Sequence, residues 1–317
     1  MSQATEPAAK AVAPTVAPTV ATEVALEADW ELDYYSRPIL EPDGKKRWEL
    51  LICSTPLPGD PAPPFRWALN CPASSVNSQW LREALEQALA AAAEQGFARP
   101  RKLRCWRASM RTMVQRAAET LGVELVPSRR CYALVEWLQE RQATVYPAEE
   151  GFMAGPLAPP PQPIQPLAVP LPEAARGDSW SWAALPLAAL REATEWEVSF
   201  AGLLPLPDGV DGQPLDPELM VSGLRLFSAS RSLAIAGWIA GLEPVRLEVS
   251  GPQLVLEAGL EDRWLLGNLE PEEAAAAAEA FQAARCNAGG LQFLAVQSSE
   301  QQQGFDGFWI LRDLPDG

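Results

Sequence analysis

Alternating apolar and charged positions mark two short stretches near the start of the chain as half-buried strands. Trp30-Glu31-Leu32-Asp33 and Trp48-Glu49-Leu50-Leu51 both follow this alternation, which is typical of antiparallel strands with one face in a core. Asp43-Gly44 lies between them, and glycine accepts the positive φ that tight hairpin turns require. The pattern therefore predicts a β-hairpin formed by residues 30–40 and 46–53.

Helical and strand patterns alternate from the hairpin to about residue 142. The predicted elements are strands at 30–40, 46–53, 65–71, 102–107 and 123–126, and helices at 77–95, 110–121 and 132–142. Asn77 and Gly96 bound the first helix, because Asn can accept the free N–H groups of a first turn and glycine tolerates the left-handed turn after a last one. Ser109 is the expected cap of the second helix. Three strands followed by alternating helices and strands give the order of a ribonuclease H-like sheet.

A proline-rich stretch divides this half from the next. Nine prolines fall between Pro147 and Pro172 and predict a stiff, extended linker. Beyond it, strands are predicted at 245–249, 253–258, 263–269, 291–297 and 308–312, with a helix at 272–285. The expected organisation is a disordered tail at 1–28, an N-terminal α/β domain at 29–146, the linker at 147–173 and a C-terminal domain at 174–317. The fold class is α/β (α+β), with a mixed sheet and helices in each lobe.

One local pattern occurs in both halves. Leu103-Arg104-x-Trp106-x-Ala108-Ser109 is echoed by Leu224-Arg225-x-Phe227-x-Ala229-Ser230, and each copy precedes an apolar helix. A divergent internal duplication would explain the echo. Chance similarity over seven positions is the alternative.

Composition restricts the chemistry that is open to this chain. Its 317 residues include no histidine, which excludes His-based acid–base catalysis, the common His-dependent nucleophiles and His-containing zinc sites. The five cysteines form no Cys-x-x-Cys pair and resemble the reduced, mostly buried thiols of an intracellular, cytoplasmic protein. No phosphate-binding or dinucleotide-binding glycine loop occurs. We therefore expect no catalytic residue, no metal, no cofactor and, because prolines interrupt the one long uncharged stretch at 152–172, no membrane span.

A ribonuclease H-like nuclease would still be compatible with the predicted strand order. Such an enzyme needs carboxylates that converge on two metal ions. Asp33 and Glu83 could supply two of them, but the strand at 103–107 carries arginines and no acid. Arginine repels Mg²⁺ and attracts phosphate, so binding is favoured over cleavage and an active nuclease remains a third alternative.

Positive charge is concentrated in one segment of an acidic chain. Residues 99–130 carry nine Arg or Lys against two Glu, a local charge of +7, and subtracting this from the whole-chain −16 leaves −23 for the remainder. A basic island of this kind favours selective anion binding, whereas an ordinary solvated helix face is the alternative. The candidate RNA-binding residues here are Arg104, Trp106, Arg107, Arg111, Arg129 and Arg130.

Several longer motifs identify a family that the chain resembles. They are Trp30–Leu40, Gly44–Cys53, Arg104-x-Trp106-Arg107, Val126–Cys131, Gly241-Leu242-Glu243, Gly289–Gln297 and Gly307–Pro315. These stretches resemble the RNA-binding translation activators of photosystem I reaction-centre messages (the Tab/Atab family) of chloroplasts and cyanobacteria. The resemblance covers nearly all of residues 30–315.

The resemblance implies a non-enzymatic protein of the cyanobacterial cytoplasm, corresponding to the chloroplast stroma of plant and algal relatives. Its partner would be single-stranded, A/U-rich RNA in the leaders of photosystem I subunit messages, with photosystem II subunits as a further target. Translation machinery or photosystem assembly factors are the implied protein partners. The alternative from another class is a protein-interaction or assembly factor that docks through its acidic lobe.

The family's RNA binding is linked to a terminal Trp-Leu-Leu tripeptide, which corresponds here to Trp309-Ile310-Leu311. On a strand, Trp309 and Leu311 share one face and Ile310 takes the other, so at least one face is core. Trp309 could stack on an unpaired base, or it could pack inside the lobe. The strand pattern favours packing, and the resemblance favours stacking.

Overall fold

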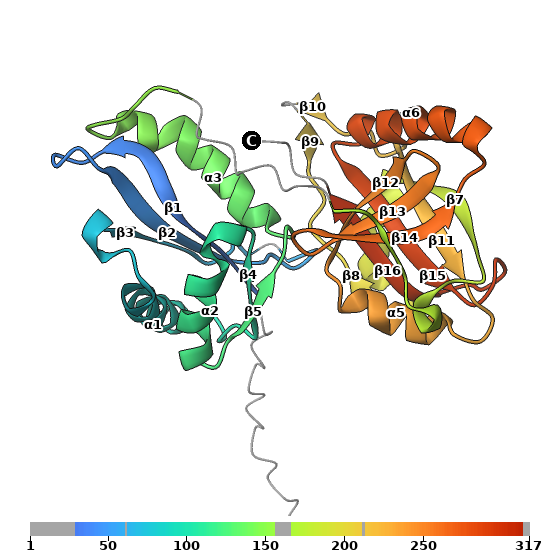
Figure 1. Cartoon of the computed structure of the whole chain (residues 1–317), viewed down its shortest axis with the longest axis horizontal. Coiled ribbons are helices and arrows are strands. Elements are labelled where there is room, and N and C mark those ends of the chain that lie inside the picture. Colours follow the sequence, from blue (N-terminus) through green and yellow to red (C-terminus); the bar gives the residue numbers. More distant parts are fainter. Residues whose placement is uncertain (1–28, 61, 156–165, 211–212, 313–317) are drawn as a thin grey trace, which may run out of the picture.

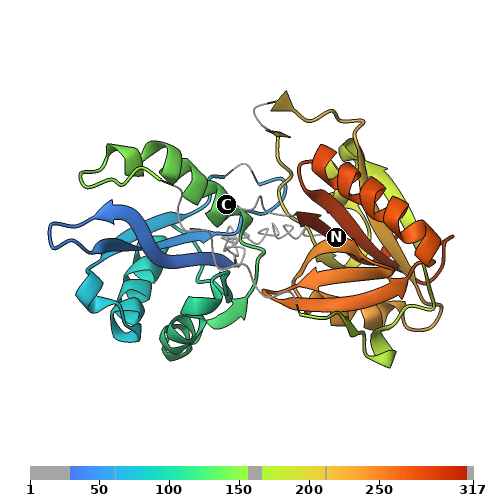
Figure 2. The same cartoon turned by 45° about the horizontal axis from the view of Figure 1, so that its top comes forward.

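Two α/β lobes lie side by side in the computed structural model, which describes residues 29–60, 62–155, 166–210 and 213–312 (Figures 1 and 2). The predicted tail at 1–28 and part of the predicted linker lie outside the described residues. The last helical element of the first lobe is the short 3₁₀ helix η3 (Tyr146–Ala148), after which Phe152 still bridges to Ile39 of β1, and the first strand of the second lobe is β6 (Val169–Pro170). Among the described residues, no helix is both long and apolar enough to cross a lipid bilayer.

The first lobe is built on one five-stranded sheet. Its elements are β1 (Trp30–Leu40), β2 (Lys46–Ser54), β3 (Arg66–Cys71), η1 (Ala73–Ser75), α1 (Ser78–Glu94), β4 (Lys102–Cys105), η2 (Ala108–Met110), α2 (Arg111–Thr120), β5 (Glu124–Pro127) and α3 (Tyr132–Thr144). The strand order is β3-β2-β1-β4-β5, with β1 to β3 antiparallel and β4 and β5 parallel to β1. The element order and the ribonuclease H-like strand order match the sequence prediction.

Helices cover both faces of this sheet. Leu32 and Tyr34 of β1 pack in a core with α1 and α2, whereas Leu51 and Cys53 of β2 pack against α3 on the opposite face. The side chain of Asn77 caps α1 by accepting a bond from the backbone of Trp80 (2.9 Å). The expected cap of α2 is wrong: Ser109 lies within η2, and that helix has no side-chain cap.

The second lobe contains two larger sheets and a two-stranded ribbon. Its further elements are η4 (Glu173–Ala175), β7 (Ser179–Pro186), α4 (Leu187–Arg191), η5 (Ala193–Glu195), β8 (Val198–Gly202), β9 (Gly209–Val210), β10 (Gln213–Pro214), β11 (Met220–Phe227), α5 (Ser232–Ala240), β12 (Pro244–Ser250), β13 (Gln253–Ala258), β14 (Asp262–Asn268), α6 (Pro271–Asn287), β15 (Leu291–Gln297) and β16 (Phe305–Arg312). The sheets have the orders β7-β11-β15-β16-β8 and β12-β13-β14-β6, and β9 pairs with β10.

The local echo between the two halves corresponds to similar strand–helix units. β4 leads into α2, and β11 leads into α5. The continuation differs, because β5 returns beside β4 whereas β12 enters the other sheet and β15 takes the place beside β11. The sheet orders of the lobes therefore differ, and an internal duplication stays a prediction.

Candidate nucleic-acid interface

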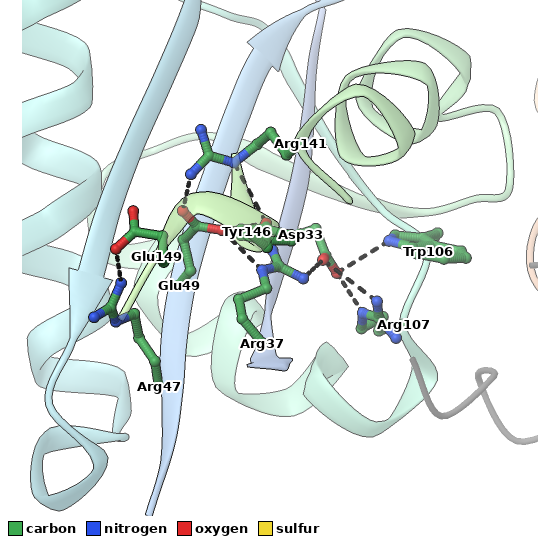
Figure 3. Close-up of polar contacts among 9 residues, drawn as sticks. All are labelled: Asp33, Arg37, Arg47, Glu49, Trp106, Arg107, Arg141, Tyr146 and Glu149. Atoms are coloured by element: carbon green, nitrogen blue, oxygen red, sulfur yellow. Dashed lines mark hydrogen bonds and ion pairs between the residues drawn. The ribbon is translucent and has the colours of Figure 1, made fainter. Parts of the chain in front are cut away.

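Asp33, the candidate metal ligand on β1, lies in a buried network of charges (Figure 3). Its carboxylate is 0% exposed and accepts bonds from three side chains: Arg37 Nη1 at 2.8 Å, Trp106 Nε1 at 3.1 Å, and Arg107 Nε. Burial raises the pKa of Asp33, but the charges and hydrogen bonds of Arg37 and Arg107 outweigh it and hold the pKa below its ordinary value. The carboxylate is therefore ionised, and its oxygens are already paired with guanidinium and indole donors.

The network continues to Glu49 on the neighbouring strand. Arg37 Nε donates to Glu49 at 2.8 Å, Tyr146 Oη donates to it at 2.6 Å, and Arg141 also pairs with it. The ring of Tyr146 is itself beneath the guanidinium of Arg141, at 5.3 Å. Two buried carboxylates are thus bridged by one arginine, so this part of the lobe is an internal framework of paired charges.

The two carboxylates of the nuclease hypothesis are not brought together. Leu32 and Tyr34 face α1 and α2, so Asp33 between them faces the opposite side of the sheet. Glu83 is exposed on α1 and accepts a bond from Gln79. The sheet therefore separates Asp33 from Glu83. Within the described part of the chain, no group of three His, Cys, Asp or Glu side chains could hold a metal ion.

Arg104, a member of the predicted basic island, joins the two lobes. Its Nε and Nη2 donate to the two oxygens of Glu243 in the second lobe, at 2.6 and 3.0 Å, and Ser128 Oγ donates to the same carboxylate at 3.0 Å. Burial raises the pKa of Glu243, but the hydrogen bonds and charge of Arg104 outweigh it and hold the pKa below its usual range. A two-point guanidinium–carboxylate pair of this kind fixes geometry as well as charge.

The backbone of Glu243 shows how closely this contact is specified. Glu243 is the one non-glycine residue with positive φ in the described chain, at 58°. A side chain in this left-handed region costs about 1–2 kcal/mol, so it persists only where the surroundings require it. Here Glu243 is held by two bonds from Arg104 and one from Ser128 to its side chain, and by a bond from the Gly259 N–H to its carbonyl.

Arg129 and Arg130 make further contacts across the same boundary. Arg129 pairs with Glu257 of β13 at 2.7 Å, and its backbone N–H donates to Gly259 in the β13–β14 turn. The guanidinium of Arg130 donates to three second-lobe carbonyls, those of Pro244 (2.6 Å), Ile310 (3.2 Å) and Gly202 (3.2 Å). We call this boundary the seam; its cross-lobe bonds also include those of Arg312 to Tyr132 and Glu136.

The C-terminal tripeptide is inside the second lobe. Trp309, Ile310 and Leu311 are 2%, 1% and 0% exposed. Trp309 and Leu311 pack on one face of the sheet and Ile310 on the other, as the strand pattern predicts. A Cβ added to Gly202 or Gly307 would lie 2.1 or 2.2 Å from the indole, so these two glycines form the slot that holds Trp309.

The structure thus places the predicted site residues in three environments. Arg104, Arg107 and Arg130 are buried, Arg129 pairs with Glu257, and Trp106 is half-buried beside Asp33. The tripeptide is core, although Arg130 reaches the carbonyl of its central residue. Of the nine, Arg111 is exposed, and its guanidinium has no hydrogen-bond or ion-pair partner among the described residues. Their role in RNA binding stays a prediction.

Sequence reasoning missed the acceptors that hold these arginines and a second exposed cation near Arg111. Ser128 and Glu243 both lie inside the motifs named above, but the sequence around each residue gives no sign that the two side chains form a hydrogen bond. Arg116 lies on α2 with Arg111, is exposed, and likewise has no partner among the described residues. A count of charge per segment includes Arg116 but cannot separate it from the buried arginines.

The fold and the seam define a two-lobed α/β protein with internal arginine–carboxylate pairs and exposed cations on α2. Residues 29–141 match the N-terminal model, and 158–312 the C-terminal domain model, of the RNA-binding protein Tab2/Atab2. The chain therefore belongs to the Tab2/Atab2 family of RNA-binding proteins.

Two relatives of this chain are both named "Protein TAB2 homolog, chloroplastic". The Zea mays protein is 38% identical over 293 residues, covering 90% of this chain and 71% of the relative. The Arabidopsis thaliana protein is 34% identical over 293 residues, covering 90% of this chain and 74% of the relative. No solved structure matches.

Proposed function

We propose that this protein binds single-stranded, A/U-rich RNA and supports translation of photosystem I subunit messages, with photosystem II subunits as a further target. Membership of an RNA-binding family supports RNA as the partner. The chloroplastic relatives support a role in photosynthetic gene expression, which we place in the cytoplasm of a cyanobacterial cell. Translation machinery would be the protein partner.

The observation that carries the proposal is the difference between the paired and unpaired arginines. Arg104, Arg107 and Arg130 already donate to carboxylates or carbonyls inside the protein. Their guanidinium groups would have to leave buried partners before they could bind phosphate, at a cost of several kcal/mol. Arg111 and Arg116 are exposed on α2 and unpaired within the described residues. We therefore assign the backbone phosphate contacts to the exposed face of α2.

The proposed function includes no catalysis. Asp33 is enclosed by Arg37, Trp106 and Arg107, and Glu83 lies beyond the opposite face of the sheet. A two-metal nuclease needs carboxylate oxygens that are free to bind metal and close to one another. These two carboxylates meet neither requirement.

Salt dependence tests the α2 assignment. Each lost phosphate contact removes about 0.7 from the slope of log affinity against log salt for a single strand, so Arg111→Gln with Arg116→Gln should flatten the slope by about 1.4. Lys46→Gln is the matched control, since it removes one exposed cation from the start of β2, in the β1–β2 hairpin remote from the seam (Figure 1). A double variant with normal melting and an unchanged slope would move the RNA site away from α2. Crosslinking in cells and sequencing of the bound RNA would test the message class.

The acidic remainder of the chain supports a second candidate function. Outside residues 99–130 the formal charge is −23, which is suited to docking basic protein partners rather than RNA. This candidate is a protein-interaction or assembly factor for photosystem subunits. Affinity purification with and without ribonuclease separates the two: photosystem polypeptides retained after ribonuclease treatment would favour the assembly role, and their loss would favour RNA binding.

A further inference from the structure

A pocket opens at the seam, on the side of the second lobe away from Trp309. Its volume is about 190 Å³. Pro58 and Gly59 in the β2–β3 loop supply the first-lobe wall, and the second lobe supplies the end of α4, the η5 turn and residues 203–206. Ile310, which is 1% exposed, closes the inner end. The pocket therefore includes residues of both lobes and exists only while the lobes are joined.

The walls of this seam pocket combine apolar surface with one available cation. Leu190, residues 203–206 and Ile310 give the apolar surface. Arg191 also lines the pocket, is exposed, and has no hydrogen-bond or ion-pair partner among the described residues. A pocket with both apolar and polar lining suits a flat heterocycle, which has apolar faces and polar edges, and a free guanidinium favours the phosphate next to it. The volume is below the usual range of about 300–1,000 Å³ for pockets that hold drug-sized ligands, so it suits a single base.

Arg130 explains how the pocket is held in shape. Its guanidinium donates to Ile310, which closes the pocket, and to Gly202, which directly precedes the wall formed by residues 203–206. Arg130 itself comes from the first lobe, just before α3. It therefore ties the basic island to the C-terminal tripeptide without lining the pocket itself.

We propose that the seam pocket accepts one unstacked base of the bound single-stranded RNA, and that Arg191 contacts the adjoining phosphate. This inference rests on the proposed function and adds a base-binding subsite to it. The remainder of the strand stays outside on the cations of the first lobe, because the chain outside residues 99–130 is strongly acidic. Recognition of an unstacked base by a protein pocket is a common mode of single-stranded RNA binding.

Two variants of the full-length protein test the two parts of the subsite separately. Thr194 lines the pocket and is exposed, so Thr194→Phe should fill part of the space without disturbing the core. Arg191→Gln removes the cation and keeps a polar side chain. The probe is a fluorescein-labelled, A/U-rich oligoribonucleotide of 12 nucleotides, titrated by anisotropy at several salt concentrations.

The two variants should differ in how they change the RNA affinity and its dependence on salt. Arg191→Gln should weaken binding about tenfold at low salt and reduce the log–log salt slope by about 0.7, because one charged contact is lost. Thr194→Phe should weaken binding with an unchanged slope, because no charge is lost. Lys46→Gln should leave the affinity nearly unchanged, and all three variants should melt like the wild type. With 4-thiouridine in the probe, crosslinked peptides should include residues 187–206, in addition to peptides of the first lobe, which holds the remainder of the strand.

The outcomes separate this inference from the proposed function. Wild-type protein that fails to bind the probe would remove both. Wild-type binding that depends on Arg111 and Arg116 but is unaffected by Thr194→Phe would overturn the subsite and leave the RNA-binding function intact. Crosslinks confined to the first lobe would overturn the subsite as well.

Discussion

Trp309→Ala distinguishes a packing role of the C-terminal tripeptide from direct RNA contact. The indole is 2% exposed and lies in the slot formed by Gly202 and Gly307. A tryptophan buries about 150–250 Å², and losing most of that apolar contact at about 25 cal/mol per Å² costs about 4–5 kcal/mol. The value agrees with the range of about 3–5 kcal/mol for aromatic-to-alanine changes in cores. Neither glycine has a side chain that could fill the empty slot.

Melting and RNA affinity should be measured on the same preparation. At about 2–4 °C per kcal/mol for a lobe of this size, the midpoint should fall by about 10 °C or more. Well below the new midpoint the protein is still folded, so RNA affinity should change little there and disappear only as the lobe unfolds. Trp309→Phe should lie between the wild type and Trp309→Ala in stability. A Trp309→Ala protein that melts like the wild type but binds RNA weakly would refute the packing account.

Three further predictions follow from the buried charges. Burial raises the pKa of Glu31 to about 7, although the hydrogen bonds from Leu134 and Thr55 oppose this shift. Between about pH 4.5 and 7 the folded carboxyl therefore keeps a proton that the unfolded one releases, so the free energy of unfolding should fall by about 3 kcal/mol over that range. Urea titrations of Glu31→Gln should lack this fall. The pKa of Glu243 is lowered, so its contribution to the free energy of unfolding should be present above about pH 4.5 and lost as the pH falls through the folded pKa. Glu243→Gln should cost about 3 kcal/mol of stability, because Arg104 loses a buried partner. A double-mutant cycle with Arg104→Met that shows no coupling energy would contradict the pairing. With Mg²⁺ or Mn²⁺ the protein should leave single-stranded RNA and RNA–DNA hybrids uncut; cleavage that disappears in Asp33→Asn would restore the nuclease hypothesis.

The first lobe was predictable because its signals are local. Strong alternation marks β1 and β2, Asn77 caps α1, and Gly96 and Gly122 have the positive φ values of 83° and 67° that residues after a helix often require. The sheet order then follows from element order and from the right-handed connections of parallel strands.

The strands missed in the second lobe lack such signals. β7 (Ser179–Pro186) and β8 (Val198–Gly202) are both edge strands, and the segment between them is rich in Ala, Leu and Glu. These residues favour helix, and part of the segment does form α4. The strand conformation of β7 depends on its pairing with β11, which lies about forty residues further along the chain. A local pattern contains no information about that partner.

The sequence likewise does not predict which arginines of the candidate site are paired. The basic island is visible in the sequence, but Arg104 finds its acceptor 139 residues away in Glu243, and Arg130 meets Ile310 180 residues away. Sequence position alone does not distinguish these arginines from Arg111, which stays unpaired among the described residues. Burial and long-range pairing separate the internal arginines from those on the surface.

The seam has the character of a contact between two subunits that happen to share one chain. Coexpressed as separate polypeptides, residues 29–155 and 166–312 should be recovered as a heterodimer, because each half supplies hydrogen-bond and ion-pair partners to charged groups of the other. Either half alone would expose Arg130, or Glu243, without its partners across the seam. Deletion mapping of RNA binding with single halves would then report the loss of a folding partner rather than the loss of a binding surface.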